Sequence, residues 1–164
     1  MELTHFDAQG RARMVNVADK NQTKRLAIAR GAVEMKADTL ERVQKGQMAK
    51  GDVLGVARVA GIMAAKRTGE LIPMCHPLLL DSVEVDFNIN EQELKVEIEA
   101  RVVTTGKTGV EMEALTAVSV AGLTIYDMCK AIDREMTVRA IRLVEKSGGK
   151  SGKFSREGEM SWQK

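Results

Sequence analysis

Residues 106–131 read GKTGVEMEALTAVSVAGLTIYDMCKA, and this stretch decides how the rest of the chain is arranged. Thr108 and Glu111 have the spacing of a capping box, in which each side chain pairs with a free backbone N–H at a helix start. An uncharged run follows from residue 114 to residue 126. A helix that is apolar on nearly every side must be buried on most of them. The stretch therefore predicts a long buried helix at the centre of the fold.

Two carboxylates flank the uncharged run. Glu113 and Asp127 are fourteen residues apart, close to four helical turns, so they point to roughly the same side. At 1.5 Å per residue they stand about 21 Å apart, which is too far for one small substrate to bridge. If both serve one site, helices from two subunits must pack so that Glu113 of one chain meets Asp127 of the other.

Asp127 also falls in the last helical turn, where the helix dipole disfavours an anion. Lys130, one turn further on, would offset that penalty. Two interpretations of this pair stay open. It is a functional acid and its partner, or it is a salt bridge at a helix end.

A β-hairpin precedes the helix. Apolar residues alternate with charged or polar ones from 83 to 89 and again from 94 to 102, on either side of Asn90-Glu91-Gln92. Such alternation indicates two antiparallel strands with one apolar face and one charged face. The charged face is expected to be solvated or to contact another subunit.

The remaining patterns complete a strand–helix–helix–hairpin–helix–strand order, with strands at 26–35 and 136–144 and helices at 38–46 and 51–68. The helix at 51–68 is rich in alanine and glycine, so we expect it to pack very close to a neighbour. The order predicts an α+β, ferredoxin-like antiparallel sheet of four strands with helices on one face and one inserted helix. We expect one domain over 1–164, with flexible ends at 1–13 and 155–164.

Composition narrows the classes of function. Lys plus Arg total 25 against 23 acids, and the chain has one Trp, one Tyr and three Phe. A ferredoxin-like RNA-binding module needs aromatic residues on its sheet, so nucleic acid is not an expected partner. Two cysteines suggest a reduced, cytoplasmic protein. No stretch has the character of a signal peptide or of a membrane span.

The loop at 69–77 is apolar and contains Pro73, Pro77 and the pair Cys75-His76. A thiol nucleophile with its base and a metal site are both weak interpretations. Neighbouring side chains in an extended segment point in opposite directions, and zinc would lack further ligands. His76 is better interpreted as a proton-transfer or substrate-binding group.

Two glycine-lysine stretches, at 106–108 and 149–151, imitate phosphate-binding P-loops. Both lack the leading glycine of that motif, which falls at Arg101 and Val144, so neither is a P-loop. A glycine-flanked helix start beside Lys107 is still suited to an anion, although a plain turn explains it as well. Among the lysines, Lys66 follows two alanines on the small-residue helix, which favours its burial near a site.

Three segments carry a resemblance to a known family: IPMCHPLLL at 72–80, the long stretch at 106–131, and EKSGGKSGKF at 145–154. They resemble molybdenum cofactor biosynthesis protein C, the family of cyclic pyranopterin monophosphate synthases, over about residues 3–154. The resemblance implies the ferredoxin-like fold and a homohexamer built as a trimer of dimers, with the active site at the dimer interface.

The resemblance also implies a lyase reaction. The substrate would be the cyclic dihydro-GTP intermediate, 3',8-cyclo-7,8-dihydroguanosine 5'-triphosphate, which is converted to cyclic pyranopterin monophosphate with release of pyrophosphate. A rearrangement of this kind needs no redox cofactor, and we expect no metal. Proton transfers suit a carboxylate, a lysine and an imidazole, and the leaving phosphates need cations.

By the same resemblance, the catalytic residues are Asp127, Lys130 and His76. The substrate-binding residues it implies are Met74, Cys75, His76, Met112, Glu113, Glu111, Lys20, Lys50, Lys66 and Lys146. One departure is Asn16, which stands where the family commonly has an aspartate. The alternative of another class is a non-catalytic nucleotide-binding sensor, which needs the basic groups but has no use for Asp127 or His76.

Overall fold

The computed structural model describes residues 5–162. The elements in chain order are β1 Thr23–Glu34, α1 Ala37–Gln44, α2 Val53–Lys66, α3 Thr68–Leu71, β2 Ser82–Asn90, β3 Lys95–Gly106, α4 Glu111–Cys129, β4 Thr137–Ser147 and β5 Phe154–Ser155. The predicted hairpin is β2–β3, and the predicted long helix is α4.

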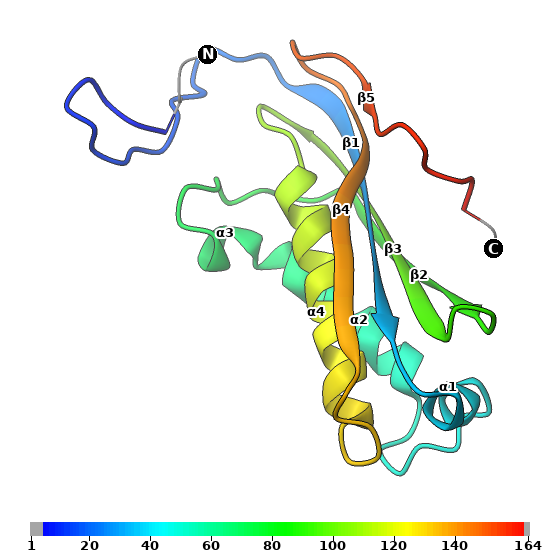
Figure 1. The fold of residues 1–164 in the computed structure, drawn as a ribbon. Helices are drawn as coiled ribbons and strands as arrows, with labels where there is room; N and C mark the ends of the chain where they lie inside the picture. The colour runs from blue at the N-terminus through cyan, green and yellow to red at the C-terminus, as the bar shows by residue number, and fades with distance from the viewer. Residues whose placement is uncertain (1–4, 163–164) are drawn as a thin grey trace.

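The strands form one antiparallel sheet in the order β2-β3-β1-β4-β5. The long helices α2 and α4 cover one face of this sheet (Figure 1). The first four strands have the β-α-β-β-α-β connectivity and order of a ferredoxin-like fold, so the predicted fold class is confirmed. The sheet has one strand more than expected, because the two-residue β5 pairs with the end of β4.

The core lies between the sheet and α4. Val118 and Ile125 of α4 are fully buried, and Val33 of β1 and Ile98 of β3 are buried beneath the helices. Gly61 of α2 explains how closely the two long helices approach: a Cβ at this position would lie 3.0 Å from the carbonyl oxygen of Ala117. The close packing predicted for the small-residue helix is therefore confirmed.

The start of α4 does not use the predicted side-chain cap. The first residue of α4 is Glu111, and its N-cap is Val110, which has no side-chain hydrogen bond, so the capping box at Thr108 is wrong. Thr108 lies in the preceding loop, where its side chain lines a cavity. The spacing matched, but the helix begins too late for Thr108 to reach its free N–H groups.

The outer face of the sheet carries charged side chains, as the hairpin pattern predicts. Arg30 of β1 lies between two neighbours on this face. Arg142 of β4 is opposite it on one side, and Glu99 of β3 is opposite it on the other side and forms an ion pair with it. The chain beyond β5 runs along this face, on the side of the sheet away from α4 (Figure 1). Flexibility of residues 1–13 and 155–164 stays a prediction. Within residues 5–162, no helix is long and apolar enough to cross a membrane.

Candidate active site

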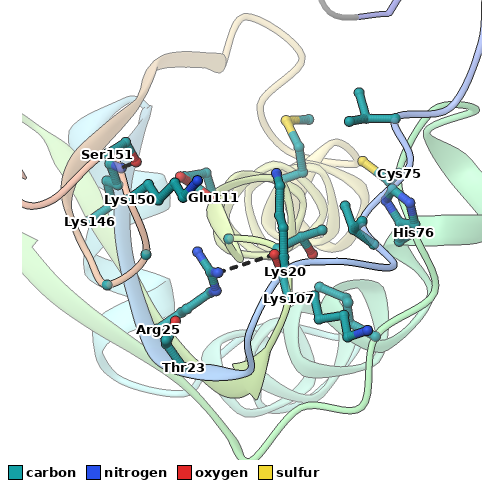
Figure 2. Close-up of a pocket in the computed structure, with 18 of the residues that line it drawn as sticks. Lys20, Thr23, Arg25, Cys75, His76, Lys107, Glu111, Lys146, Lys150 and Ser151 are labelled. Carbon is teal, nitrogen blue, oxygen red and sulfur yellow. Dashed lines mark hydrogen bonds between the residues drawn. The ribbon is translucent and has the colours of Figure 1, made fainter.

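A cavity of about 880 Å³ opens beside the first turn of α4 (Figure 2). Five parts of the chain form its wall: His5, residues 15–26 up to and including the start of β1, the loop at 74–78, the loop and helix start at 107–113, and the end of β4 with the loop at 146–151. These include parts of all three segments that carry the family resemblance. The volume is typical of a site for a small organic ligand.

One side of the cavity is weakly polar. Met74, Cys75, His76 and Met112 line it. Burial, together with the nearby Glu113 carboxylate, raises the pKa of the Cys75 thiol. The thiol therefore stays protonated at neutral pH and is a poor nucleophile, because the thiolate is the reactive form.

Glu113 is the most perturbed acid of the cavity. Its residue is only 4% exposed, and burial raises the pKa of its carboxyl from 4.5 to about 7, with a further contribution from Glu111. A carboxyl with a pKa near the working pH exchanges protons readily in either direction. Glu113 is therefore a candidate for proton transfer as well as for the substrate contact expected from the sequence.

The other side of the cavity is basic. Lys20, Lys107, Lys146 and Lys150 line it together with Arg25. The Arg25 guanidinium is fixed by the end of β3 and the loop after it, since Nε donates to the Gly106 carbonyl at 2.9 Å. Its Nη2 donates to the Lys107 carbonyl at 3.1 Å (Figure 2). Such fixed cations favour a phosphorylated or otherwise anionic ligand.

Sequence reasoning missed Arg25. No local signal separates it from Lys24, because its position depends on the pairing of β1 with β3, which places Thr23 opposite Gly106. Lys107 was singled out from its glycine-flanked loop. Its Nζ donates to the Ala18 carbonyl at 2.7 Å, which ties that loop to the segment leading into β1.

The loop at 148–153 packs directly on Arg25. Gly148 and Gly149 have φ angles of +94° and +74°, in the region that favours glycine. A Cβ on Gly149 would lie 2.2 Å from Arg25 Nη1, and a Cβ on Gly148 would lie 2.3 Å from the Lys24 carbonyl oxygen. Glycine is needed at both positions for backbone conformation and for space. The loop brings Lys150 and Ser151 to the cavity beside Lys146, whose Nζ donates to Ser151 Oγ.

Asp127, Lys130 and Lys50 form a second cluster at the opposite end of α4. Lys50 Nζ donates to Asp127 Oδ2 at 3.0 Å and to its carbonyl at 2.9 Å, and Lys130 Nζ lies 2.7 Å from Oδ1. The side chains are 48–57% exposed. The hydrogen bonds from Lys130 and Lys50 lower the pKa of the Asp127 carboxyl, so it is ionised at neutral pH.

The expected site residues thus fall into two groups within one chain. The cavity collects Met74, Cys75, His76, Glu111, Met112, Glu113, Lys20 and Lys146. The other end of α4 holds Lys50, Asp127 and Lys130. Lys66 belongs to neither group. It is exposed in the last turn of α2 and does not line the cavity, so the burial expected for it is wrong.

Asn16 does not line the cavity. Its side-chain oxygen accepts a hydrogen bond from the backbone N–H of Ala18 at 2.9 Å, which forms a local turn. An aspartate carboxylate is able to accept the same bond. Across the part of the chain that the structure describes, no three His, Cys, Asp or Glu side chains are grouped as metal ligands.

The fold and the cavity define a class: a ferredoxin-like α+β protein with a cavity that has one weakly polar side and one basic side. The chain belongs to the MoaC family, whose model matches residues 14–149. This finding confirms the resemblance seen in the sequence.

The relatives match over nearly the whole chain. A protein of Pelotomaculum thermopropionicum is 63% identical over 98% of this chain and 94% of its own length. One of Heliobacterium modesticaldum is 67% identical over 94% of this chain and 98% of its own length. One of Desulforamulus reducens is 64% identical over 99% of each. Each of these relatives is named cyclic pyranopterin monophosphate synthase.

Proposed function

We propose that this chain is a cyclic pyranopterin monophosphate synthase acting in an early step of molybdenum cofactor biosynthesis. As a lyase, it converts 3',8-cyclo-7,8-dihydroguanosine 5'-triphosphate to cyclic pyranopterin monophosphate and releases pyrophosphate. The observation that carries this proposal is the identity of 63–67% to relatives of that name over almost their full length. The cavity is in keeping with it, because it combines a weakly polar side with a basic side.

The basic side of the cavity suits the phosphate part of the reaction. A cyclic monophosphate forms from a triphosphate when a substrate hydroxyl attacks the α-phosphorus and the bond to the leaving pyrophosphate breaks. Negative charge then builds up on the leaving oxygen, and fixed cations aimed at it lower the barrier. Arg25, Lys107 and Lys146 are the residues we assign to this task, with Lys20 and Lys150 beside them.

The weakly polar side suits the ring part of the substrate. Opening and reclosing a ring requires several proton transfers. We assign one of them to Glu113, because its pKa is raised to about 7, and we keep His76 as a second proton-transfer group. Because substrate and products stand at the same overall oxidation level in this rearrangement, no redox cofactor enters the proposal.

We infer that the complete site is shared between two subunits. The α4 helix spans 19 residues, so its two ends lie about 28 Å apart, and the Asp127 cluster cannot reach the cavity of its own chain. A symmetric dimer that places the end of one α4 beside the start of the other would bring Lys50, Asp127 and Lys130 to the partner's cavity. The family resemblance extends this to a trimer of such dimers.

Exposed apolar residues support subunit contacts on the helix layer. Val56, Val59 and Met63 lie along α2, and Leu123 lies on α4, each 46–59% exposed. Apolar patches of this kind are typical of protein–protein interfaces. We also propose a cytoplasmic location, because both cysteines are free, as is usual in a reducing compartment.

The direct test is pyrophosphate release by the purified protein given the cyclised dihydro-GTP nucleotide. We expect stoichiometric release together with formation of cyclic pyranopterin monophosphate. Tight binding of the nucleotide without release would overturn the enzyme proposal in favour of a sensor. A protein that neither binds nor converts the nucleotide would contradict both.

The pH dependence of turnover tests the role of Glu113. We propose that its carboxylate accepts a proton, and a base works only when deprotonated. Because the pKa is about 7, log kcat/KM should rise with pH up to about 7 and then level off. In Glu113→Gln, kcat/KM should fall by about 10²-fold or more, and this rise should disappear.

The control for this profile is His76→Asn, which removes the other proton-transfer candidate of the cavity while leaving Glu113 in place. It should lose activity and still show the rise toward pH 7. A Glu113→Gln enzyme whose remaining activity follows the wild-type profile would show that another group titrates there.

A further inference from the structure

The C-terminal segment folds back on the sheet directly after the glycine loop at 148–153. We call its described part, residues 156–162, the tail. Phe154 and Ser155 of β5 pair with Lys146 and Glu145 of β4. Arg156 continues the pairing, since its backbone N–H donates to the Val144 carbonyl at 2.8 Å and its Nε to the Leu143 carbonyl at 2.7 Å. The chain therefore leaves the loop at 148–153 in a fixed direction, along the outer face of the sheet.

A compact ionic cluster holds the segment on that face. Glu159 accepts a hydrogen bond from Arg142 Nη2 at 2.7 Å and another from Arg142 Nε, and it pairs with Arg30 Nη1 at 3.2 Å. Arg30 in turn binds Glu99 through Nε at 2.8 Å. We call Arg30, Glu99, Arg142 and Glu159 the tail latch. The side chains of Arg30 and Glu159 are only 13% exposed and that of Glu99 is 8% exposed, so this is no ordinary surface pair.

Two further contacts extend the latch toward the end of the chain. Arg30 Nη1 donates to the Met160 carbonyl at 2.7 Å, and the Arg30 guanidinium lies 5.4 Å from the ring centroid of Trp162. The indole Nε1 of Trp162 is shielded from solvent. Glu159 is the only member of the latch that belongs to the tail, so the ion pairs that hold the tail in the latch all involve this one carboxylate.

The latch also affects the loop at 148–153, whose residues Lys150 and Ser151 line the cavity. The loop at 148–153 contains Gly148, Gly149 and Gly152, all at positive φ, and glycine-rich backbone is intrinsically flexible. One end of the loop continues from β4, and the other leads into β5 and the docked tail. The Lys146–Ser151 hydrogen bond and an ion pair between Lys153 and Glu145 at 3.5 Å lie between these two ends. Holding both ends limits the positions that Lys150 and Ser151 can take over the cavity.

We propose that Glu159 is a positioning residue for phosphate binding: by docking the tail on Arg30 and Arg142, it holds the glycine loop over the basic side of the cavity. A loop that is ordered before binding does not have to be ordered by the ligand, which strengthens binding. This inference rests on the proposed function, because it takes the phosphates of the substrate to lie at that side.

Trp162 supplies the test, because it is the single tryptophan of the chain. Its fluorescence and the quenching of that fluorescence by acrylamide report whether the tail is docked. The variant is Glu159→Gln, and the matched control is Glu157→Gln, since Glu157 is exposed and enters no ion pair in the described part of the chain. Pyrophosphate is the binding probe, and its Kd is measured by calorimetry.

In Glu159→Gln we expect stronger quenching of Trp162 and a Kd for pyrophosphate raised about fivefold or more. Fivefold is the smallest change in affinity that is typical when two sites in a protein are coupled. The kcat/KM of the nucleotide should fall by at least the same factor, because a displaced Lys150 weakens both phosphate binding and the stabilisation of the leaving pyrophosphate. By reciprocity, pyrophosphate should protect Trp162 from acrylamide in the wild type and in Glu157→Gln.

Two results would overturn the inference. In one, Glu159→Gln leaves the quenching of Trp162 at the wild-type level, so that this carboxylate does not dock the tail. In the other, quenching increases but the Kd for pyrophosphate does not, so that the docked tail does not position the loop. Failure of the proposed function appears separately, as wild-type protein that binds pyrophosphate through the loop but does not convert the nucleotide.

Discussion

Asp127→Ala is expected to abolish turnover, with a loss of kcat/KM of about 10³-fold or more, while the fold and the oligomer persist. The carboxylate holds Lys50 and Lys130 in one cluster, and without it the two ammonium groups would repel each other and separate. A misplaced cation in an active site costs orders of magnitude in rate. The same change removes only exposed ion pairs, which contribute about 0–1 kcal/mol to stability.

This contrast between activity and stability is what the experiment measures. Pyrophosphate release gives kcat/KM, thermal unfolding gives Tm, and sedimentation gives the oligomeric state. Asp38→Ala is the matched control, because Asp38 forms a comparably exposed ion pair with Arg42 on α1, away from the cavity. Retention of activity within about twofold in Asp127→Ala would remove Asp127 from the site. Parallel losses of activity and Tm would reduce the cluster to a helix-end salt bridge.

The two flanking carboxylates of α4 differ in electrostatics, which assigns them different tasks. Burial raises the pKa of Glu113 to about 7, whereas the lysines lower the pKa of Asp127. A carboxylate whose pKa is lowered is a weak base and an even poorer proton donor at neutral pH. We therefore assign proton transfer to Glu113 and the placement of cations to Asp127. When environments push pKa values apart in this way, the roles usually separate too.

The sequence predicted the structural features that leave a local pattern in the chain. Period-two alternation located β2 and β3, the uncharged run located α4, and the order of elements was sufficient for the ferredoxin-like topology. Small residues correctly indicated the tight contact of Gly61 with α4. These features are set by patterns within one element, so they can be seen in the chain itself.

Features that depend on distant pairing were missed. Arg25 lines the cavity because β1 pairs with β3, and the tail docks because Arg30 and Arg142 lie side by side on β1 and β4. No spacing within the tail predicts this, since the partner residues lie up to about 130 positions away. The capping box at Thr108 failed for a related reason: a four-residue motif cannot tell where the packed helix begins.

Mixing two inactive variants should restore activity if the site is shared. In a symmetric dimer, each site would take Glu113 from one chain and Asp127 from the other. A dimer of one Glu113→Ala chain and one Asp127→Ala chain then has one site with both changes and one site with neither. Random pairing of equal amounts makes half of the dimers mixed, so about a quarter of all sites, and about a quarter of wild-type turnover, should return.

The measurement is pyrophosphate release after the two variants are co-expressed with different affinity tags and the doubly tagged assemblies are purified. In a trimer of dimers this purification removes only the hexamers made of one variant, so the expected recovery stays at about a quarter. Each variant purified alone gives the residual activity for comparison. A mixture of Glu113→Ala with the double variant is the control and should stay inactive, because neither arrangement of its chains rebuilds a site. If the purified mixed assemblies are as inactive as either variant alone, Glu113 and Asp127 do not share a site across the subunit interface. In that case the cavity and the Asp127 cluster, at opposite ends of the 19-residue α4, would be two independent sites.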